Sequence, residues 1–312
     1  MDALGKAAMG LEFDSLSESK VPFIENYNTV FESINPLYFI FPVLETKNNP
    51  FRRRYHEALE NLEAYFSQVL MARRKEIHDG LIIKDNADLL TLLILAETEG
   101  SFSDKEIRDN IMVFLIAGQD TTAFSLSASL YLLATNPDIQ DNLRNELVSV
   151  LGDEPTIPTL EQLQKMPYLA SCIKETLRLY PPVARLPARV CEEDILIEGH
   201  LIPKGTRVSI DTYRLHHDPQ NWTYPEKFDP TRFSDSAFSL DPALSGFAWC
   251  PFGGYSRSCL GTSFSLLEQK VVLSILLLSY VISPREPNQP FNLSHNSLLM
   301  PKDLSLVFTP RR

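Results

Sequence analysis

Residues 252–261 read Phe252-Gly253-Gly254-Tyr255-Ser256-Arg257-Ser258-Cys259-Leu260-Gly261, a loop that places one cysteine among glycines. An apolar helix is predicted directly after it, from Phe264 to about Ile282, so amide N–H groups and a positive dipole end face Cys259. Arg257 adds positive charge two residues before the sulfur. Such surroundings favour a thiolate, which is a soft ligand for iron. The loop therefore indicates a metal-thiolate site, with a buried free cysteine in a glycine-rich turn as the alternative.

A second feature lies in the middle of a long predicted helix. Residues 103–106 form a capping box, and a helical pattern continues from there to Asn136-Pro137, which predicts one helix of about 103–136. Its centre reads Ala117-Gly118-Gln119-Asp120-Thr121-Thr122, a glycine and four polar residues between apolar turns. These small and hydroxylated residues favour either a functional opening of the helix or a packing notch that a neighbouring side chain fills.

Further helices are predicted on both sides of the long one. In the first hundred residues they cover about 1–11, 22–34, 50–78 and 86–98, the third with Asn49 as its cap and Pro50 at its first position. After the long helix, one begins at Pro137, and another carries Glu175 and Arg178 on one face. By itself this Glu–Arg spacing indicates a surface ion pair of little energetic weight.

The last part of the chain alternates short strand patterns with irregular segments. Strands are predicted at residues 186–190, 195–198 and 206–211, a meander rich in Pro, Asp and aromatic residues at 219–252, and a turn at 295–296 followed by a closing strand. The chain is therefore predicted to be mainly α with small antiparallel β-sheets.

Composition limits the function. Of 312 residues, 44% are hydrophobic, and 29 basic against 40 acidic residues give a net charge of −11, which argues against nucleic-acid binding. Four cysteines without C-x-x-C spacing fit a reducing compartment, and the adjacent His216 and His217 indicate structural hydrogen bonds rather than a zinc site. The longest apolar run, 271–282, is shorter than the roughly 20 residues that span a bilayer.

The cysteine loop resembles a known signature. Phe252, Arg257, Cys259 and Gly261 match the cysteine loop of the cytochromes P-450, the heme-thiolate monooxygenases. Tyr255 departs from it, because the family usually has glycine two residues before the Arg. A turn close to a flat ligand suits positive φ, so we expect Gly254 and Ser256 to absorb the turn and Tyr255 to point away from the cofactor. The alternative is a distorted loop that holds the cofactor weakly.

Two other segments resemble the same family. Residues 117–122 match its oxygen-activation motif, and Glu175 with Arg178 matches its E-x-x-R pair, which a later arginine joins, here Arg232. Thr231 replaces the more frequent Glu of that later motif. The resemblance implies the cytochrome P-450 fold with its N-terminal part missing, and a structural role for the Glu–Arg–Arg network.

The resemblance also implies a cofactor and its ligands. The cofactor is heme b, and Cys259 is the proximal iron ligand and the metal-binding residue. Arg257 and Arg189 are expected to bind the heme propionates, and Phe252 and Gly261 complete the cofactor-binding set. Asp120 and Thr121 are the expected catalytic pair, similar to the family's residues that deliver protons during oxygen activation.

By this resemblance the chain is a monooxygenase that inserts one atom of O₂ into an apolar small-molecule substrate, with electrons from an NADPH-cytochrome reductase. We expect residues 1–312 to form a single partial domain of an N-terminally truncated protein. The resemblance is to the eukaryotic microsomal type of the family, to which fungal proteins also belong. The full-length protein is expected at the cytoplasmic face of the endoplasmic reticulum membrane, held by the missing N-terminal anchor. Two alternatives are a truncated, heme-poor, non-catalytic remnant and a heme isomerase or dehydratase that needs no reductase.

Overall fold

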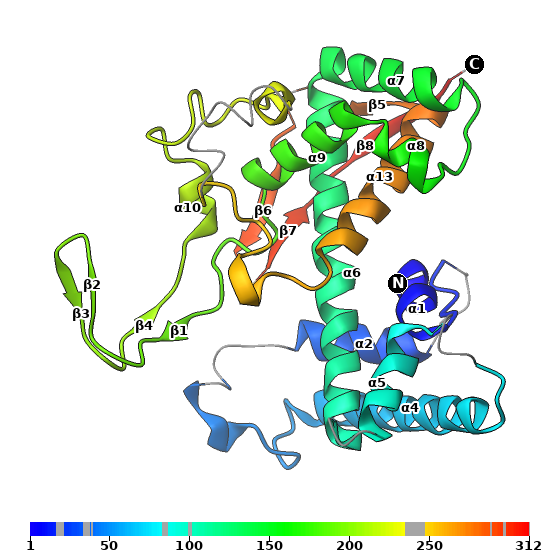
Figure 1. Ribbon diagram of the computed structural model, residues 1–312, viewed down its shortest axis with the longest axis vertical. Helices are drawn as coiled ribbons and strands as arrows, with labels where there is room; N and C mark the ends of the chain where they lie inside the picture. Colours follow the sequence, from blue (N-terminus) through cyan, green and yellow to red (C-terminus); the bar gives the residue numbers. More distant parts are fainter. Residues whose placement is uncertain are drawn as a thin grey trace. The chain divides into compact units, whose positions relative to one another are not determined.

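The computed structural model describes residues 1–16, 22–33, 38, 40–82, 87–98, 102–234, 247–287, 289–295 and 298–311. The described chain is mainly helical with small antiparallel sheets, as predicted (Figure 1). It folds as two compact units, Met1–Gln119 and Asp120–Arg312. The single domain expected from the sequence stays a prediction.

Unit 1 is built from helices. They are α1 (Asp2–Met9), α2 (Pro22–Glu32), the short 3-10 helix η1 (Pro42–Leu44), α4 (Arg53–His78), α5 (Leu89–Thr98) and the first half of α6 (Asp104–Thr135). The i, i+4 spacing of Leu62, Phe66 and Leu70 puts them on one buried face of α4. The ring of Phe23, on α2, meets Phe66 edge to face at 5.8 Å. Helix α4 therefore packs on α2 through aromatic contacts.

The predicted start of α4 was three residues too early. The Asn49 side chain accepts the N–H of Phe51 at 3.1 Å, and its carbonyl accepts the N–H of Arg52 at 2.9 Å. These bonds close a turn before the helix, because Asn competes for nearby backbone donors. Pro50 therefore lies in this turn, and α4 begins at Arg53.

The capping box of the long helix is confirmed. The Ser103 N–H donates to Glu106 Oε2 at 2.8 Å, and the Glu106 N–H donates to Ser103 Oγ at 3.3 Å. These reciprocal bonds satisfy two donors that a helix start otherwise leaves free. Helix α6 then continues as an unbroken α-helix through the polar residues 117–122.

Unit 2 contains the remaining elements. Its helices are the second half of α6, α7 (Pro137–Leu151), α8 (Leu160–Gln164), α9 (Pro167–Leu179), α10 (Thr212–His216), α13 (Thr262–Ser279) and the 3-10 turns η3 (Pro230–Phe233) and η4 (Tyr255–Arg257). Leu143 of α7, Leu177 of α9 and Leu273 of α13 are fully or almost fully buried in one core. Pro137 and Pro167 stand at the first positions of α7 and α9, where a missing N–H costs nothing.

In the part of unit 2 that the structure describes, the strands form four two-stranded antiparallel sheets. They pair β1 (Arg189–Val190) with β4 (Arg207–Val208), β2 (Ile195–Ile197) with β3 (His200–Ile202), β5 (Tyr280–Pro284) with β8 (Leu306–Pro310), and β6 (Asn292–His295) with β7 (Leu299–Lys302). The predicted turn at Gly199 is confirmed, with Glu198 and Gly199 at φ 48° and 84°. Part of the expected meander, 235–246, and Asn296 of the expected tail turn lie outside the described residues.

Two helices of the described chain, α6 and α13, are long and apolar enough to cross a membrane by length and composition alone. The core helix of a folded domain can have the same length and composition. Helix α13 buries Leu273, Leu277 and the polar Gln269 inside unit 2. We therefore interpret α13 as a core helix.

Candidate functional site

The cysteine loop is closed by its own backbone. The Gly253 N–H donates to the Cys250 carbonyl at 3.0 Å, and the Cys259 N–H donates to the Phe252 carbonyl at 2.9 Å. Gly253 has φ 71°, a conformation that glycine adopts without strain. Phe252 packs against the core of unit 2, and α13 starts three residues after Cys259. These hydrogen bonds thus fix the position of the Cys259 backbone.

The four cysteines differ in their surroundings. Cys172 and Cys250 are buried, Cys191 is partly buried, and Cys259 is exposed. Burial raises the pKa of the Cys172 and Cys250 thiols, so both stay protonated near neutral pH. The alternative of a buried cysteine at 259 is therefore wrong, and Cys259 is the cysteine best placed to bind a metal from outside the fold.

Tyr255 takes the strained position itself. Its φ is 54°, whereas Gly254 is extended with φ −164°, so the expectation that Gly254 and Ser256 absorb the turn was wrong. An added Cβ on Gly254 would lie 3.1 Å from the Phe247 ring, a tight contact from which the ring would have to shift. The Tyr255 ring is 83% exposed and stacks on Phe247 with 4.8 Å between ring centroids.

The remaining residues of the predicted cofactor set lie in two elements. Arg257 is the last residue of η4, and both Arg257 and Gly261 are exposed beside Cys259. An added Cβ on Gly261 would lie 3.8 Å from Cys259 Sγ, an ordinary contact. Arg189 is also exposed but lies in β1, opposite Val208 of β4. The cofactor set thus combines the cysteine loop with one arginine from a separate sheet.

The polar turn of α6 is tied to the helix that follows the cysteine loop. Thr122 is buried, and its Oγ1 lies 3.0 Å from Ser265 Oγ of α13. Gln269 Nε2 donates to the same Ser265 hydroxyl at 3.2 Å. Asp120 and Thr121 are half-buried next to Thr122. The structure thus places the predicted catalytic pair one residue from a direct contact with α13.

Ser265 and Gln269 were not predicted from the sequence. A signal was present, because these polar residues are four positions apart in the predicted helix and therefore share one face. The packing-notch interpretation holds for Gly118, where an added Cβ would lie 2.8 Å from Leu4 Cδ2. The small residue in α6 is thus explained by packing inside unit 1, and the buried Thr122 by its contact with Ser265 inside unit 2.

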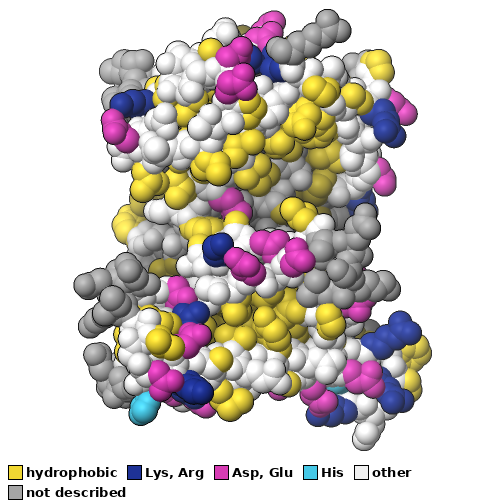
Figure 2. Space-filling model, turned by 90° about the vertical axis from the view of Figure 1, so that its right-hand side faces the viewer, with side chains coloured by type: hydrophobic (Ala, Val, Ile, Leu, Met, Phe, Trp, Pro, Cys, Tyr) yellow, Lys and Arg dark blue, Asp and Glu magenta, His cyan; other side chains and the backbone are white. Residues whose placement is uncertain are grey.

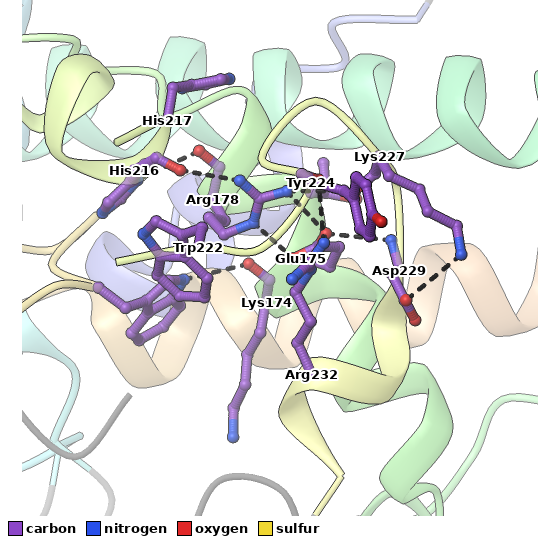
Figure 3. A network of polar contacts seen from close by, with 12 residues as sticks. Lys174, Glu175, Arg178, His216, His217, Trp222, Tyr224, Lys227, Asp229 and Arg232 are labelled. Atoms are coloured by element: carbon purple, nitrogen blue, oxygen red, sulfur yellow. Dashed lines mark hydrogen bonds and ion pairs between the residues drawn. The ribbon is translucent and has the colours of Figure 1, made fainter. Parts of the chain in front are cut away.

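The predicted Glu–Arg–Arg network is present and buried (Figure 3). Arg178 donates from Nε and Nη2 to both oxygens of Glu175 at 2.7 and 2.8 Å, and neither side chain is exposed. Arg232 Nε lies 3.3 Å from Glu175 Oε1, and the Asp229 N–H donates to that oxygen at 3.0 Å. Burial raises the pKa of Glu175, and Arg178 opposes this shift. Because both oxygens accept N–H donors, the geometry fits the ionised carboxylate.

The network also binds backbone carbonyls of the chain that leads to the cysteine loop. Arg178 Nη1 donates to the His216 carbonyl at 2.8 Å, and Arg232 Nη2 donates to the Tyr224 carbonyl at 3.0 Å. The indole N–H of Trp249 donates to the Lys174 carbonyl at 3.1 Å. The pair is therefore a buried scaffold, and the surface ion-pair interpretation is wrong.

Charged side chains elsewhere are mixed in sign. On the face drawn in Figure 2, Lys and Arg side chains lie among Asp and Glu side chains and exposed hydrophobic ones. The net charge of −11 argues against a polyanionic partner.

Comparison with known proteins identifies relatives along the whole chain. A family model described as Cytochrome P450 matches residues 1–308. The chain is 36% identical to cytochrome P450 3A2 of Rattus norvegicus over 330 aligned residues, covering 100% of this chain and 63% of that protein. It is 35% identical to cytochrome P450 3A5 of Homo sapiens over 318 residues, covering 97% of this chain and 61% of that protein. The chain thus spans less than two thirds of the length of these relatives.

Proposed function

Because this chain belongs to the cytochrome P450 family, we propose that it acts as a heme-dependent monooxygenase. One atom of O₂ enters an apolar organic substrate. The other atom takes up two electrons and two protons and leaves as water. The electrons come from NADPH through a cytochrome reductase. The protein works at the cytoplasmic face of the endoplasmic reticulum membrane. The family match confirms the resemblance that the sequence motifs indicated.

Members of this family bind heme b, and the residues of the loop fit it. Cys259 offers an exposed soft sulfur ligand whose backbone is already held by the bond to Phe252. Gly261 leaves the space beside the sulfur free of a side chain. We assign Arg257 and Arg189 to the propionates, since both are exposed cations that can pair with carboxylates.

A thiolate-bound heme supplies the oxygen chemistry, since the thiolate pushes electron density that favours O–O cleavage. Asp120 and Thr121 hold and pass the protons, a carboxylate and a hydroxyl on one turn of α6. The bond between Thr122 and Ser265 keeps this turn in register with α13, which follows Cys259.

The single observation that carries this proposal is the exposed Cys259 at the start of α13, in a loop whose other cysteine, Cys250, is buried. The heme-poor remnant is the second candidate, and the observation that favours it is Tyr255 at positive φ beside the ligand. The isomerase or dehydratase alternative has no supporting contact among the described residues, and the polar turn of α6 argues for oxygen activation.

The first test is spectroscopic. The protein is reconstituted with hemin, reduced and exposed to carbon monoxide, and the strongly red-shifted Soret band of a thiolate complex is measured. Cys259→His should abolish that band, and Cys250→Ala should keep it. Loss of the band in Cys250→Ala alone contradicts the ligand assignment, and a parent protein that retains no hemin supports the remnant.

The second test concerns the proton pair. Thr121→Ala should keep heme and substrate binding while electrons from the reductase form hydrogen peroxide instead of product. Thr135→Ala, at the far end of α6 with its hydroxyl bonded to the Tyr131 carbonyl, is the matched control. An unchanged ratio of product to NADPH in Thr121→Ala contradicts the assigned role.

A further inference from the structure

His216 occupies a fully buried position between α9 and the chain that enters the cysteine loop (Figure 3). It is the last residue of α10. Its Nδ1 lies 3.2 Å from the Arg178 carbonyl oxygen, and its Nε2 lies 3.0 Å from the backbone nitrogen of Cys250. Both ring nitrogens therefore bind backbone groups from other segments.

The chemistry of these two partners fixes the imidazole tautomer. A carbonyl oxygen only accepts, so Nδ1 must carry the hydrogen that points to Arg178. A peptide N–H only donates, so Nε2 must offer its lone pair to Cys250. One neutral Nδ1–H form satisfies both contacts, and neither the other tautomer nor the imidazolium does.

Backbone hydrogen bonds connect the His216–Cys250 contact to Cys259. The backbone of Cys250 makes two bonds here: its N–H donates to His216 Nε2, and its carbonyl accepts the N–H of Gly253. Phe252 then accepts the Cys259 N–H. Cys250, two residues before the loop, is thus held by His216 through its N–H and by Gly253 of the loop through its carbonyl.

The opposite end of His216 joins the buried ion pair. Arg178 Nη1 donates to the His216 carbonyl, while His216 Nδ1–H donates to the Arg178 carbonyl, so the two residues exchange hydrogen bonds. Arg178 is fixed by both oxygens of Glu175. The imidazole is therefore a rigid bridge from the Glu175–Arg178 pair to Cys250.

We propose that His216 is a positioning residue for the thiolate loop, whose Nε2 lone pair sets the backbone of Cys250 and through it the place of Cys259. This inference deepens the proposed function and rests on it. It assigns no contact between His216 and the heme. It predicts that an acceptor at Nε2, rather than the size of the ring, is what the loop requires.

Two amide substitutions separate the two ring nitrogens. Asn carries its amide nitrogen as many bonds from Cβ as Nδ1, so His216→Asn keeps a donor for Arg178 and leaves the Cys250 N–H unpaired. Gln carries its oxygen as far out as Nε2, so His216→Gln keeps the acceptor. His216→Phe keeps a ring and loses both groups. His217→Asn is the matched control, because its Nδ1 contacts Tyr213 and not the loop.

Two measurements are made on this set. The first is hydrogen exchange at the Cys250 amide in the heme-free protein, which should be about tenfold faster in His216→Asn and His216→Phe, since a buried N–H has lost its acceptor. The second is the rate of hemin release to apomyoglobin, together with the fraction of the reduced carbon monoxide complex that shows the thiolate band. His216→Gln should stay near the parent in both, and His217→Asn should match the parent.

The outcomes are separable. If His216→Asn matches the parent in Cys250 exchange and hemin release, or if His216→Gln is as impaired as His216→Phe, the positioning role is wrong while the proposed function stands. A parent protein without a thiolate band contradicts the proposed function, and the exchange experiment still decides the role of His216. Should His216→Phe fail to fold, the comparison of the Asn and Gln variants carries the test.

Discussion

The Glu175–Arg178 pair and the segment 255–261 lie in the same unit but are held in opposite ways. The pair is unexposed and every charged atom meets a donor or acceptor, several of them backbone groups. The cysteine segment is exposed from Tyr255 to Gly261 and is fixed by a few backbone bonds. A rigid scaffold behind an open ligand loop is what a fold needs when a prosthetic group is to dock on prepared ligands. Disturbing the two regions should therefore have different consequences.

The largest effect is expected from Glu175→Ala. It leaves Arg178 buried without its carboxylate, so the free energy of unfolding should fall by about 3 to 5 kcal/mol. Urea denaturation followed by circular dichroism measures this. The matched control is Glu161→Ala, which removes the exposed partner of Lys165 and should cost less than about 0.5 kcal/mol. A Glu175→Ala protein as stable as the control means that the network contributes no more than a surface pair.

The next effect is a pH dependence that arises at His216. Burial, assisted by the Arg178 guanidinium, lowers the pKa of His216 from 6.5 to about 3. As the pH falls below 6.5 the unfolded state takes up a proton that the folded state does not bind until about pH 3. The contribution of the neutral His216 to the free energy of unfolding is thus fully present above pH 6.5 and declines as the pH falls below it.

The slope of this decline is testable against His216→Gln, which cannot titrate there. Relative to that variant, the parent should lose up to about 1.4 kcal/mol of unfolding free energy per pH unit between pH 6 and 4. Glu175, Arg178 and His217 face the same site in both proteins, so their contributions largely cancel. Parallel pH profiles of parent and variant contradict the buried neutral imidazole.

The smallest effect is expected at Tyr255. Positive φ in a bulky residue costs about 1 to 3 kcal/mol, and the stack on Phe247 returns about 0.5 to 1.5 kcal/mol. Glycine also loses more chain entropy on folding, so Tyr255→Gly should change stability by less than about 1 kcal/mol. The heme content should change little.

A double-mutant cycle sharpens this expectation. In a Phe247→Ala background there is no stack to lose, so Tyr255→Gly should be more stabilising there by about 0.5 to 1.5 kcal/mol. Thermal unfolding of the four proteins gives the coupling. A large gain in heme retention from Tyr255→Gly alone means that the natural loop is impaired, and it supports the heme-poor remnant.

The features that were predicted correctly from the sequence are those that depend on residues close together in the chain. The capping box at Ser103, the long helix after it and the turn at Gly199 follow from neighbouring residues. The Glu175–Arg178 spacing indicated a shared helix face, but only the resemblance to the family indicated burial. The structural hydrogen bonding predicted for His216 is confirmed. Its partners, and the contact between Thr122 and Ser265, could not be predicted in this way, because they join segments far apart in the chain.

Two errors have the same physical origin. At Asn49 the helix start was assigned by a general capping preference, although the Phe51 N–H that the side chain binds lies in a turn before the helix, which begins at Arg53. At Tyr255 the turn was assigned to the neighbouring glycine, although Phe247 packs against that glycine and stacks on the tyrosine. In both places a specific contact outweighs the average preference of a residue type.

The exposure of Cys259 has a consequence for the redox chemistry of the protein. A solvent-accessible thiol is open to peroxide, which converts it to sulfenic acid and, with excess oxidant, to acids that no thiol reductant restores. Cys250 lies nine residues away in the sequence but is buried behind the His216 contact, so a protective disulfide between them requires the loop to open first. Among the four cysteines, the residue that the proposed chemistry depends on is therefore the one most open to oxidants, including peroxide released by an uncoupled enzyme of this class.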